Sequence, residues 1–185
     1  MDRVRLIAGA ALGCAALAGG AAVVAGEAAA PAAAGAPAAA KLAAELPASW
    51  QPMSDAVAAV QGSLGQVGIA GAQVAAWGDP ARRCYAVFLQ ASVKGKPSEL
   101  EAGLRAALAP AQREGDAAGA GSGSATSALE VRLPLTAPVP GMMVARLRAE
   151  GPVTHVRALA CGHMDRYPEA CAAQCTRLQA QLEAP

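Results

Sequence analysis

The chain has 185 residues, and its 15 basic and 14 acidic side chains give a formal net charge of only +1. Neither sign forms a block along the sequence, which excludes a continuous basic segment of the kind that binds nucleic acid or an anionic surface. Hydrophobic residues make up 54% of the chain but aromatic residues only 3%, and alanine buries little area, so we expect one domain with a thin core.

The N-terminus has the pattern of an export signal. A mildly basic start is followed by an uncharged run from Leu6 to Gly26. About 21 apolar residues can also span a bilayer as a helix, but this run is mostly Ala and Gly, which favours cleavage over a retained anchor. Lipidation at Cys14 is a third alternative, although Ala11 stands where a lipoprotein signal usually has leucine. We therefore expect residues 1–26 to direct the chain out of the cytoplasm, to the periplasm, the exterior or the outer side of a membrane.

Composition divides the rest of the chain into a tether and a domain. Residues 27–48 are rich in Ala and Pro, which predicts a disordered, semi-extended tether. The single domain is expected to span residues 49–185. It is interrupted by a flexible loop at about 113–127, where Gly, Ser and Ala show no periodicity.

The first half of the domain has the periodicity of a helix, a hairpin and a second helix. Residues 52–65 carry apolar side chains at spacings of three and four, which indicates one buried helical stripe. The β-rich runs 68–77 and 84–93 flank turn residues and predict a hairpin. A capping box of Ser98 and Glu101 begins a second helix, which ends before a proline.

The second half predicts three strands and a last helix. Strict alternation over 129–135 indicates a half-buried strand, and Pro134 favours an edge position. Residues 142–147 and 153–161 flank a Glu-Gly-Pro turn and predict another hairpin, and Pro168 begins the helix. The order α-β-β-α-β-β-β-α predicts an α+β fold in two layers, with about five mostly antiparallel strands and the helices on one face of the sheet.

Four cysteines follow the N-terminal segment, and an even number in an exported protein predicts two disulfides. Cys171 and Cys175 lie one turn apart on the same helix face, so they are badly placed to bond each other. Cys161 ends a strand, and Cys171 lies in the first turn of the helix that folds back over it. We therefore expect the pairs Cys161–Cys171 and Cys84–Cys175 in preference to the crossed pairing, with contributions of about 2.5–3 and about 4.5 kcal/mol respectively.

A metal site is the alternative use of these residues. Zinc accepts three thiolates and an imidazole, here from Cys161, His163, Cys171 and Cys175. The spacing matches no familiar zinc motif, and an oxidising compartment favours disulfides, so we predict no metal and no cofactor.

The sequence contains no specific catalytic motif. There is no Gly-x-Ser-x-Gly elbow, and the glycine-rich run 119–124 lacks the lysine of a phosphate loop. Disulfide bonding of Cys161 excludes a nucleophile pair with His163. No local motif is specific enough to assign a family.

The functional expectation is a non-enzymatic accessory domain, exported or associated with the envelope, that binds an unknown protein or envelope component. We expect no nucleic acid, and membrane contact only through an uncleaved N-terminal segment. The alternative is a small hydrolase-like exported enzyme with a site assembled from distant residues. A pocket holding His155 or His163 beside a carboxylate or an unpaired cysteine favours the enzyme. An apolar patch around Trp77 or Met142–Met143 favours binding.

Overall fold

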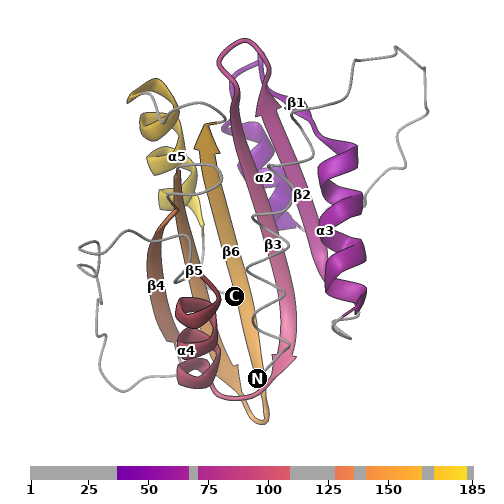
Figure 1. Ribbon diagram of the computed structural model, residues 1–185, viewed down its shortest axis with the longest axis vertical. Helices are drawn as coiled ribbons and strands as arrows, with labels where there is room; N and C mark the ends of the chain where they lie inside the picture. Colours follow the sequence, from indigo (N-terminus) through magenta and orange to yellow (C-terminus); the bar gives the residue numbers. More distant parts are fainter. Residues whose placement is uncertain (1–36, 67–70, 109–127, 136–140, 164–168, 183–185) are drawn as a thin grey trace.

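The computed structural model describes residues 37–66, 71–108, 128–135, 141–163 and 169–182 (Figure 1). The export signal expected at 1–26, the first part of the tether, the loop expected at about 113–127 and the helix start expected at Pro168 lie outside these residues. Within these ranges, none of the helices has both the length and the apolar character needed to cross a bilayer.

A six-stranded antiparallel sheet forms the middle of the molecule. Its spatial order is β1-β2-β3-β6-β5-β4. The strands are β1 (Gln51–Pro52), β2 (Gln73–Asp79), β3 (Cys84–Lys94), β4 (Ala128–Leu135), β5 (Gly141–Glu150) and β6 (Val153–His163). The α+β class and both predicted hairpins are confirmed, and β4 lies at the sheet edge, where a proline costs no ladder hydrogen bond. The sixth strand, β1, has only two residues, which is too short to leave a periodic signal.

Four helices lie in the described part of the chain, one more than the sequence predicted. They are α2 (Pro37–Ala44), α3 (Ser54–Gln66), α4 (Pro97–Leu108) and α5 (Glu169–Gln181). Helix α2 falls inside the expected tether at 27–48, so that expectation is wrong for its second part. The reason is a short apolar stripe: Ala39 and Leu42 are buried, Leu42 to 1% exposure, in the same core cluster as α5. The folded unit therefore begins at or before Pro37 rather than at residue 49.

The helices cover both faces of the sheet, so the expectation of two layers with helices on one face is wrong. Helices α3 and α4 pack Val60 and Leu104 against one face, and α4 lies in front of the sheet in Figure 1. Helices α2 and α5 pack Leu42 and Leu178 in a separate cluster on the other face. The cause lies in the central strands, because consecutive residues of β3 point to opposite faces and residues 84–89 are all buried. A strand that is apolar on both sides needs cover on both sides.

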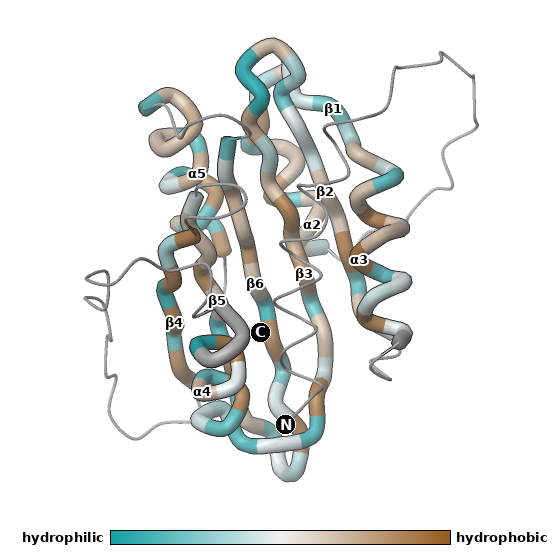
Figure 2. The backbone as a smooth tube through the Cα atoms, in the orientation of Figure 1, coloured by the Kyte–Doolittle hydropathy of each residue, from teal (hydrophilic) through white to brown (hydrophobic). Residues whose placement is uncertain are grey.

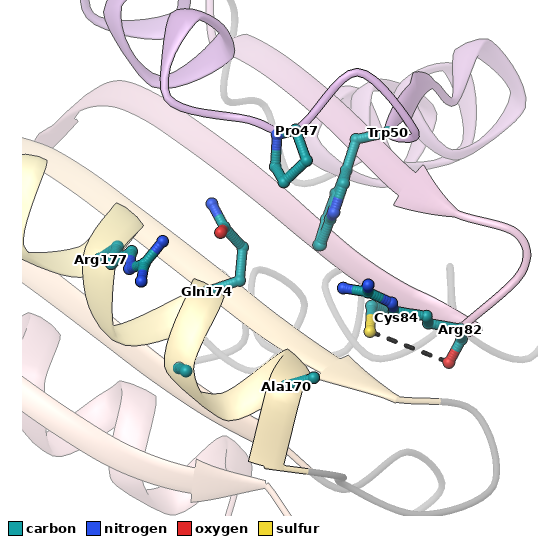
Figure 3. A pocket seen from close by; sticks show the side chains of 8 residues that line it. Pro47, Trp50, Arg82, Cys84, Ala170, Gln174 and Arg177 are labelled. Carbon is teal, nitrogen blue, oxygen red and sulfur yellow. Dashed lines mark hydrogen bonds between the residues drawn. The ribbon is translucent and has the colours of Figure 1, made fainter.

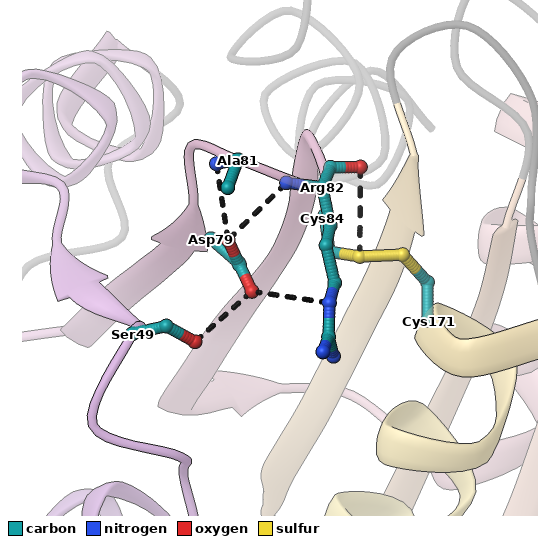
Figure 4. Close-up of polar contacts among 6 residues, drawn as sticks. All are labelled: Ser49, Asp79, Ala81, Arg82, Cys84 and Cys171. Carbon is teal, nitrogen blue, oxygen red and sulfur yellow. Dashed lines mark hydrogen bonds and ion pairs between the residues drawn. A yellow bond between two sulfur atoms is a disulfide. The ribbon is translucent and has the colours of Figure 1, made fainter.

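Two disulfides connect α5 to the sheet, and they form the crossed pairing. Cys84 bonds Cys171, and Cys161 bonds Cys175 (Figure 4 shows the first). The expected pairs Cys161–Cys171 and Cys84–Cys175 are therefore wrong, whereas the expectation of two disulfides between the helix and the strands is confirmed.

The strand register explains this pairing. Cys84 lies at the end of the β3–β6 ladder, opposite His163, whereas Cys161 lies two residues further in. Helix α5 begins at that end, so its first-turn Cys171 meets the outermost strand cysteine. Cys175 is about 6 Å further along the helix, which matches the step of about 6.6 Å along the strand to Cys161.

The two disulfides should contribute unequally to stability. Cys84–Cys171 closes a loop with a sequence separation of 87 and Cys161–Cys175 one of 14. In the chain-entropy model these links contribute about 4.5 and about 3 kcal/mol. We expect the C84A/C171A variant to unfold at lower urea than C161A/C175A, with fully reduced wild type below both. Peptide mapping under non-reducing conditions should recover the two links described; recovery of Cys161 bonded to Cys171 would contradict the register.

Candidate functional site: a basic face of the sheet

The sheet face that packs against α2 and α5 changes from apolar to polar along the strands. Residues paired between neighbouring strands share a face, so each step of two residues along a strand moves one row along the sheet. An apolar row under the helices contains Ala75, Phe88, Leu159 and Val144, and at the edge strand β4 it ends in Arg132. The next row is polar throughout and consists of Gln73, Gln90, Arg157, Arg146 and Glu130. The row after that holds Ser92, His155 and Arg148. In Figure 2 this half of β3 and β6 alternates between hydrophilic and hydrophobic positions, because only the opposite face stays apolar there.

We call this polar half of the sheet the arginine face. Its basic members are Lys94, Arg132, Arg146, Arg148 and Arg157. It also holds Gln90, Ser92, Glu130, Glu150 and His155. Five basic side chains therefore share the face with two carboxylates. The charge balance along the sequence conceals this segregation, so the absence of a basic block in the sequence does not extend to the folded surface.

Glu130 holds two of the arginines in place. The Nε of Arg132 donates to Glu130 Oε1 at 2.8 Å, and the Nε of Arg146 donates to Oε2 at 2.8 Å. Partial burial acts to raise the pKa of Glu130, but the hydrogen bonds and charges of Arg146 and Arg132 outweigh it and leave the pKa below its ordinary value. The carboxylate therefore stays charged, and it orients two guanidinium groups that have further N–H donors.

Arg146 and Arg157 are direct cross-strand partners on β5 and β6. Like charges in this position destabilise a sheet. Glu130 compensates Arg146, and the Nε of Arg157 donates to Gln90 Oε1 at 3.0 Å. The pair is therefore accommodated by its neighbours, and its presence is not explained by sheet stability.

A chain of three polar side chains lies in the next rows. Ser92 Oγ is 2.9 Å from His155 Nδ1, and His155 Nε2 is 3.0 Å from Glu150 Oε2. Ser92 and His155 are 63 residues apart in sequence but directly opposite in the β3–β6 ladder. Ser92 and Glu150 are exposed, and His155 is partly exposed. Sequence reasoning missed this group because it depends on the register between two strands that are distant in the chain.

The other residues considered from the sequence lie in structural positions. Cys161, Cys171 and Cys175 are bonded in disulfides, so the thiolates of the alternative zinc site are not available. Among the described residues no group of three or more His, Cys, Asp or Glu side chains could hold a metal ion. His163 is buried at the end of β6.

The apolar residues considered as a binding patch belong largely to the cores. Trp77 packs under α2 and α5, and Met143 packs under α4. Met142 is half-buried. These residues therefore do not form an exposed apolar patch.

The lowered pKa of Glu130 gives an expected pH dependence. A carboxyl with a depressed folded-state pKa stabilises the fold above its unfolded pKa and loses this contribution as the pH falls through the folded value. We expect the stability difference between wild type and E130Q to be largest near neutral pH and to shrink from about pH 5 downward. Urea titrations across this range would measure it. In an R132Q/R146Q background the E130Q difference should lose most of its pH dependence; an unchanged pH dependence there would contradict the assignment.

Comparison with protein-family models, with curated proteins and with solved structures finds no match to this chain. The chemistry of the described residues is therefore the ground on which a function is assigned.

Proposed function

We propose that this protein is an exported, non-enzymatic accessory domain that binds an acidic protein surface through the arginine face. The observation that carries the proposal is the gathering of five basic side chains from four strands on one sheet face. Two disulfides and the uncharged run from Leu6 to Gly26 support export, because structural disulfides persist in oxidising compartments.

The arginine face has the chemistry of a binding surface. Guanidinium groups match carboxylates with two parallel hydrogen bonds, and arginine is enriched among the residues that dominate interface energies. Hydrogen bonds to Glu130 and Gln90 hold three of the arginines before a partner arrives. This preorganisation lowers the entropy lost on binding.

The two carboxylates favour an acidic protein over a uniform polyanion. Glu130 lies within the basic group and Glu150 at its border, and both repel a continuous run of phosphates. A protein surface can place its own basic or neutral side chains opposite them, which gives specificity as well as attraction. The residues that define the face include no Phe, Tyr or Trp, the large rings on which nucleic-acid bases stack best. Its one imidazole, that of His155, is held between Ser92 and Glu150.

A charge-neutralising pair tests this proposal. Arg132 and Arg148 are exposed, so replacing them should leave the fold intact. We expect R132Q/R148Q to bind a labelled peptide rich in Asp and Glu about tenfold more weakly than wild type, the loss expected when charge-assisted hydrogen bonds are removed. Wild-type binding should also weaken with added salt. The matched control is R83Q/R105Q, with the same charge change at the opposite end of β3 from Lys94 and on α4, and it should bind as wild type does.

Two outcomes would contradict the proposal. One is an equal loss of peptide binding in the control variant, which would show that net charge rather than the arginine face matters. The other is binding to phosphatidylglycerol vesicles without binding to the acidic peptide, which would identify a lipid surface as the partner.

A second candidate function is hydrolysis, which the Ser92–His155–Glu150 chain favours. A serine hydroxyl beside an imidazole that is oriented by a carboxylate is the arrangement of a nucleophilic hydrolase. It ranks below binding because Ser92 and Glu150 are exposed on the sheet, whereas such chemistry benefits from a site that excludes water.

Covalent labelling distinguishes the two candidates. We expect a fluorophosphonate probe to leave Ser92 unmodified, because Ser92 and Glu150 are exposed on the sheet and water has access to them. Intact mass and peptide mapping would measure this, with S98A as the control beside S92A. Labelling at Ser92 that is lost in H155Q would instead favour the enzyme.

A further inference from the structure

A cleft lies at the other end of the same sheet face, between α5 and the segment that joins α2 to β1 (Figure 3). Its volume is about 210 Å³. Pro47 and Trp50 form one wall, and Ala173, Gln174 and Arg177 of α5 form the opposite wall. It shares no residue with the arginine face.

The walls of the cleft are held in fixed positions. The Cys84–Cys171 disulfide connects α5 to β3 at this end of the sheet. Gln174 Nε2 donates to the backbone carbonyl of Glu45 at 3.2 Å, which connects α5 to the joining segment. The backbone N–H of Trp50 donates to the carbonyl of Pro47 at 2.9 Å and closes the turn that presents the indole. A cleft with such walls is preorganised for a ligand.

Two arginines approach the cleft from different elements. Arg177 is exposed on α5 and has no ion-pair or hydrogen-bond partner among the residues that the structure describes. Arg82 comes from the turn between β2 and β3 and is 60% exposed, with its Nε 3.8 Å from Asp79 Oδ2. In Figure 3 the two guanidinium groups lie on opposite sides of the cleft.

Asp79 fixes the position of Arg82 without closing the cleft. Its Oδ1 accepts the backbone N–H groups of Ala81 and Arg82, at 3.1 and 3.2 Å, which shapes the turn (Figure 4). Its Oδ2 accepts the hydroxyl of Ser49 at 3.0 Å. Asp79 is itself buried and does not line the cleft. The terminal nitrogens of Arg82 are therefore directed by a carboxylate that a ligand does not need to displace.

We propose that this cleft binds a small organic carboxylate with a flat apolar body. The lining contains two guanidinium groups and no carboxylate, so it favours an anion. The indole of Trp50, the ring of Pro47 and the alanines of α5 accept an apolar group, and aromatic rings contribute beyond the area they bury. The inference goes beyond the proposed function, because it concerns another part of the protein and a small ligand.

Benzoate is a suitable probe, with neutral benzyl alcohol of similar size as its partner. Titration of the full-length protein should give a saturable change in the fluorescence of Trp50, and W50F should abolish it while Trp77 still reports an intact core. We expect R177Q to weaken benzoate binding about tenfold, since a charge-assisted hydrogen bond is lost. R177K should bind better than R177Q, and the α4 control R105Q should bind as wild type does.

Three results would overturn the proposal. The first is the absence of saturable binding up to about 10 mM benzoate, a concentration above the millimolar Kd of a weak specific ligand. The second is binding of benzyl alcohol as tight as that of benzoate. The third is unchanged benzoate binding in R177Q. The variant R132Q/R148Q should bind benzoate normally. Loss of benzoate binding in R177Q and loss of peptide binding in R132Q/R148Q are therefore separate outcomes.

Discussion

The alignment of β3 with β6 is the constraint on which the rest of the structure depends. This ladder runs from the pair Cys84 and His163 to the pair Lys94 and Val153. It places the strand cysteines in the two rows that α5 reaches, and it brings Ser92 to His155 and Gln90 to Arg157. A slip of one residue would turn every one of these side chains to the opposite face. Both the disulfides and the charged surface therefore follow from one register.

Local pattern in the sequence was enough for most elements but not for their assembly. The hairpins and the edge position of Pro134 depend on neighbouring residues, and local patterns in the sequence show them directly. The second helix was also predicted, but its expected capping box of Ser98 and Glu101 is wrong: the helix begins at Pro97, and Glu99 accepts the backbone N–H of Lys96. Helix α2 was hidden because alanine stripes carry little hydrophobic contrast. The need for helices on both faces of the sheet could also be predicted in part, because residues 84–89 of β3 are apolar on both sides. Which helices cover each face depends on chain topology, which the local pattern does not show.

The proposed binding surfaces could not be predicted from the sequence for a related reason. Arg132, Arg146, Arg148 and Arg157 are scattered over 26 positions among neutral and acidic residues, and only strand pairing gathers them. Prediction of the cysteine pairing likewise requires the row of the sheet in which each cysteine lies, not its distance along the chain. Sequence spacing alone favoured a bond between cysteines that are close in the chain. In the structure, one turn of α5 instead matches a two-residue step along the strands. Long-range register is the information that a single sequence does not display.

Both cross-links lie in the first half of α5, while its second half is held by the apolar contacts of Leu178 and of Leu182, the residue that follows the helix. Before the thiols are oxidised, those contacts and a few hydrogen bonds are all that the described structure offers to keep the helix on the sheet. Release of α5 would expose Phe88, Leu159 and Val144 together, and such an apolar surface favours aggregation. On the proposed export route, oxidation of the thiols would therefore fix α5 on the sheet, and a chain whose thiols stay reduced would be more open to chaperones and proteases.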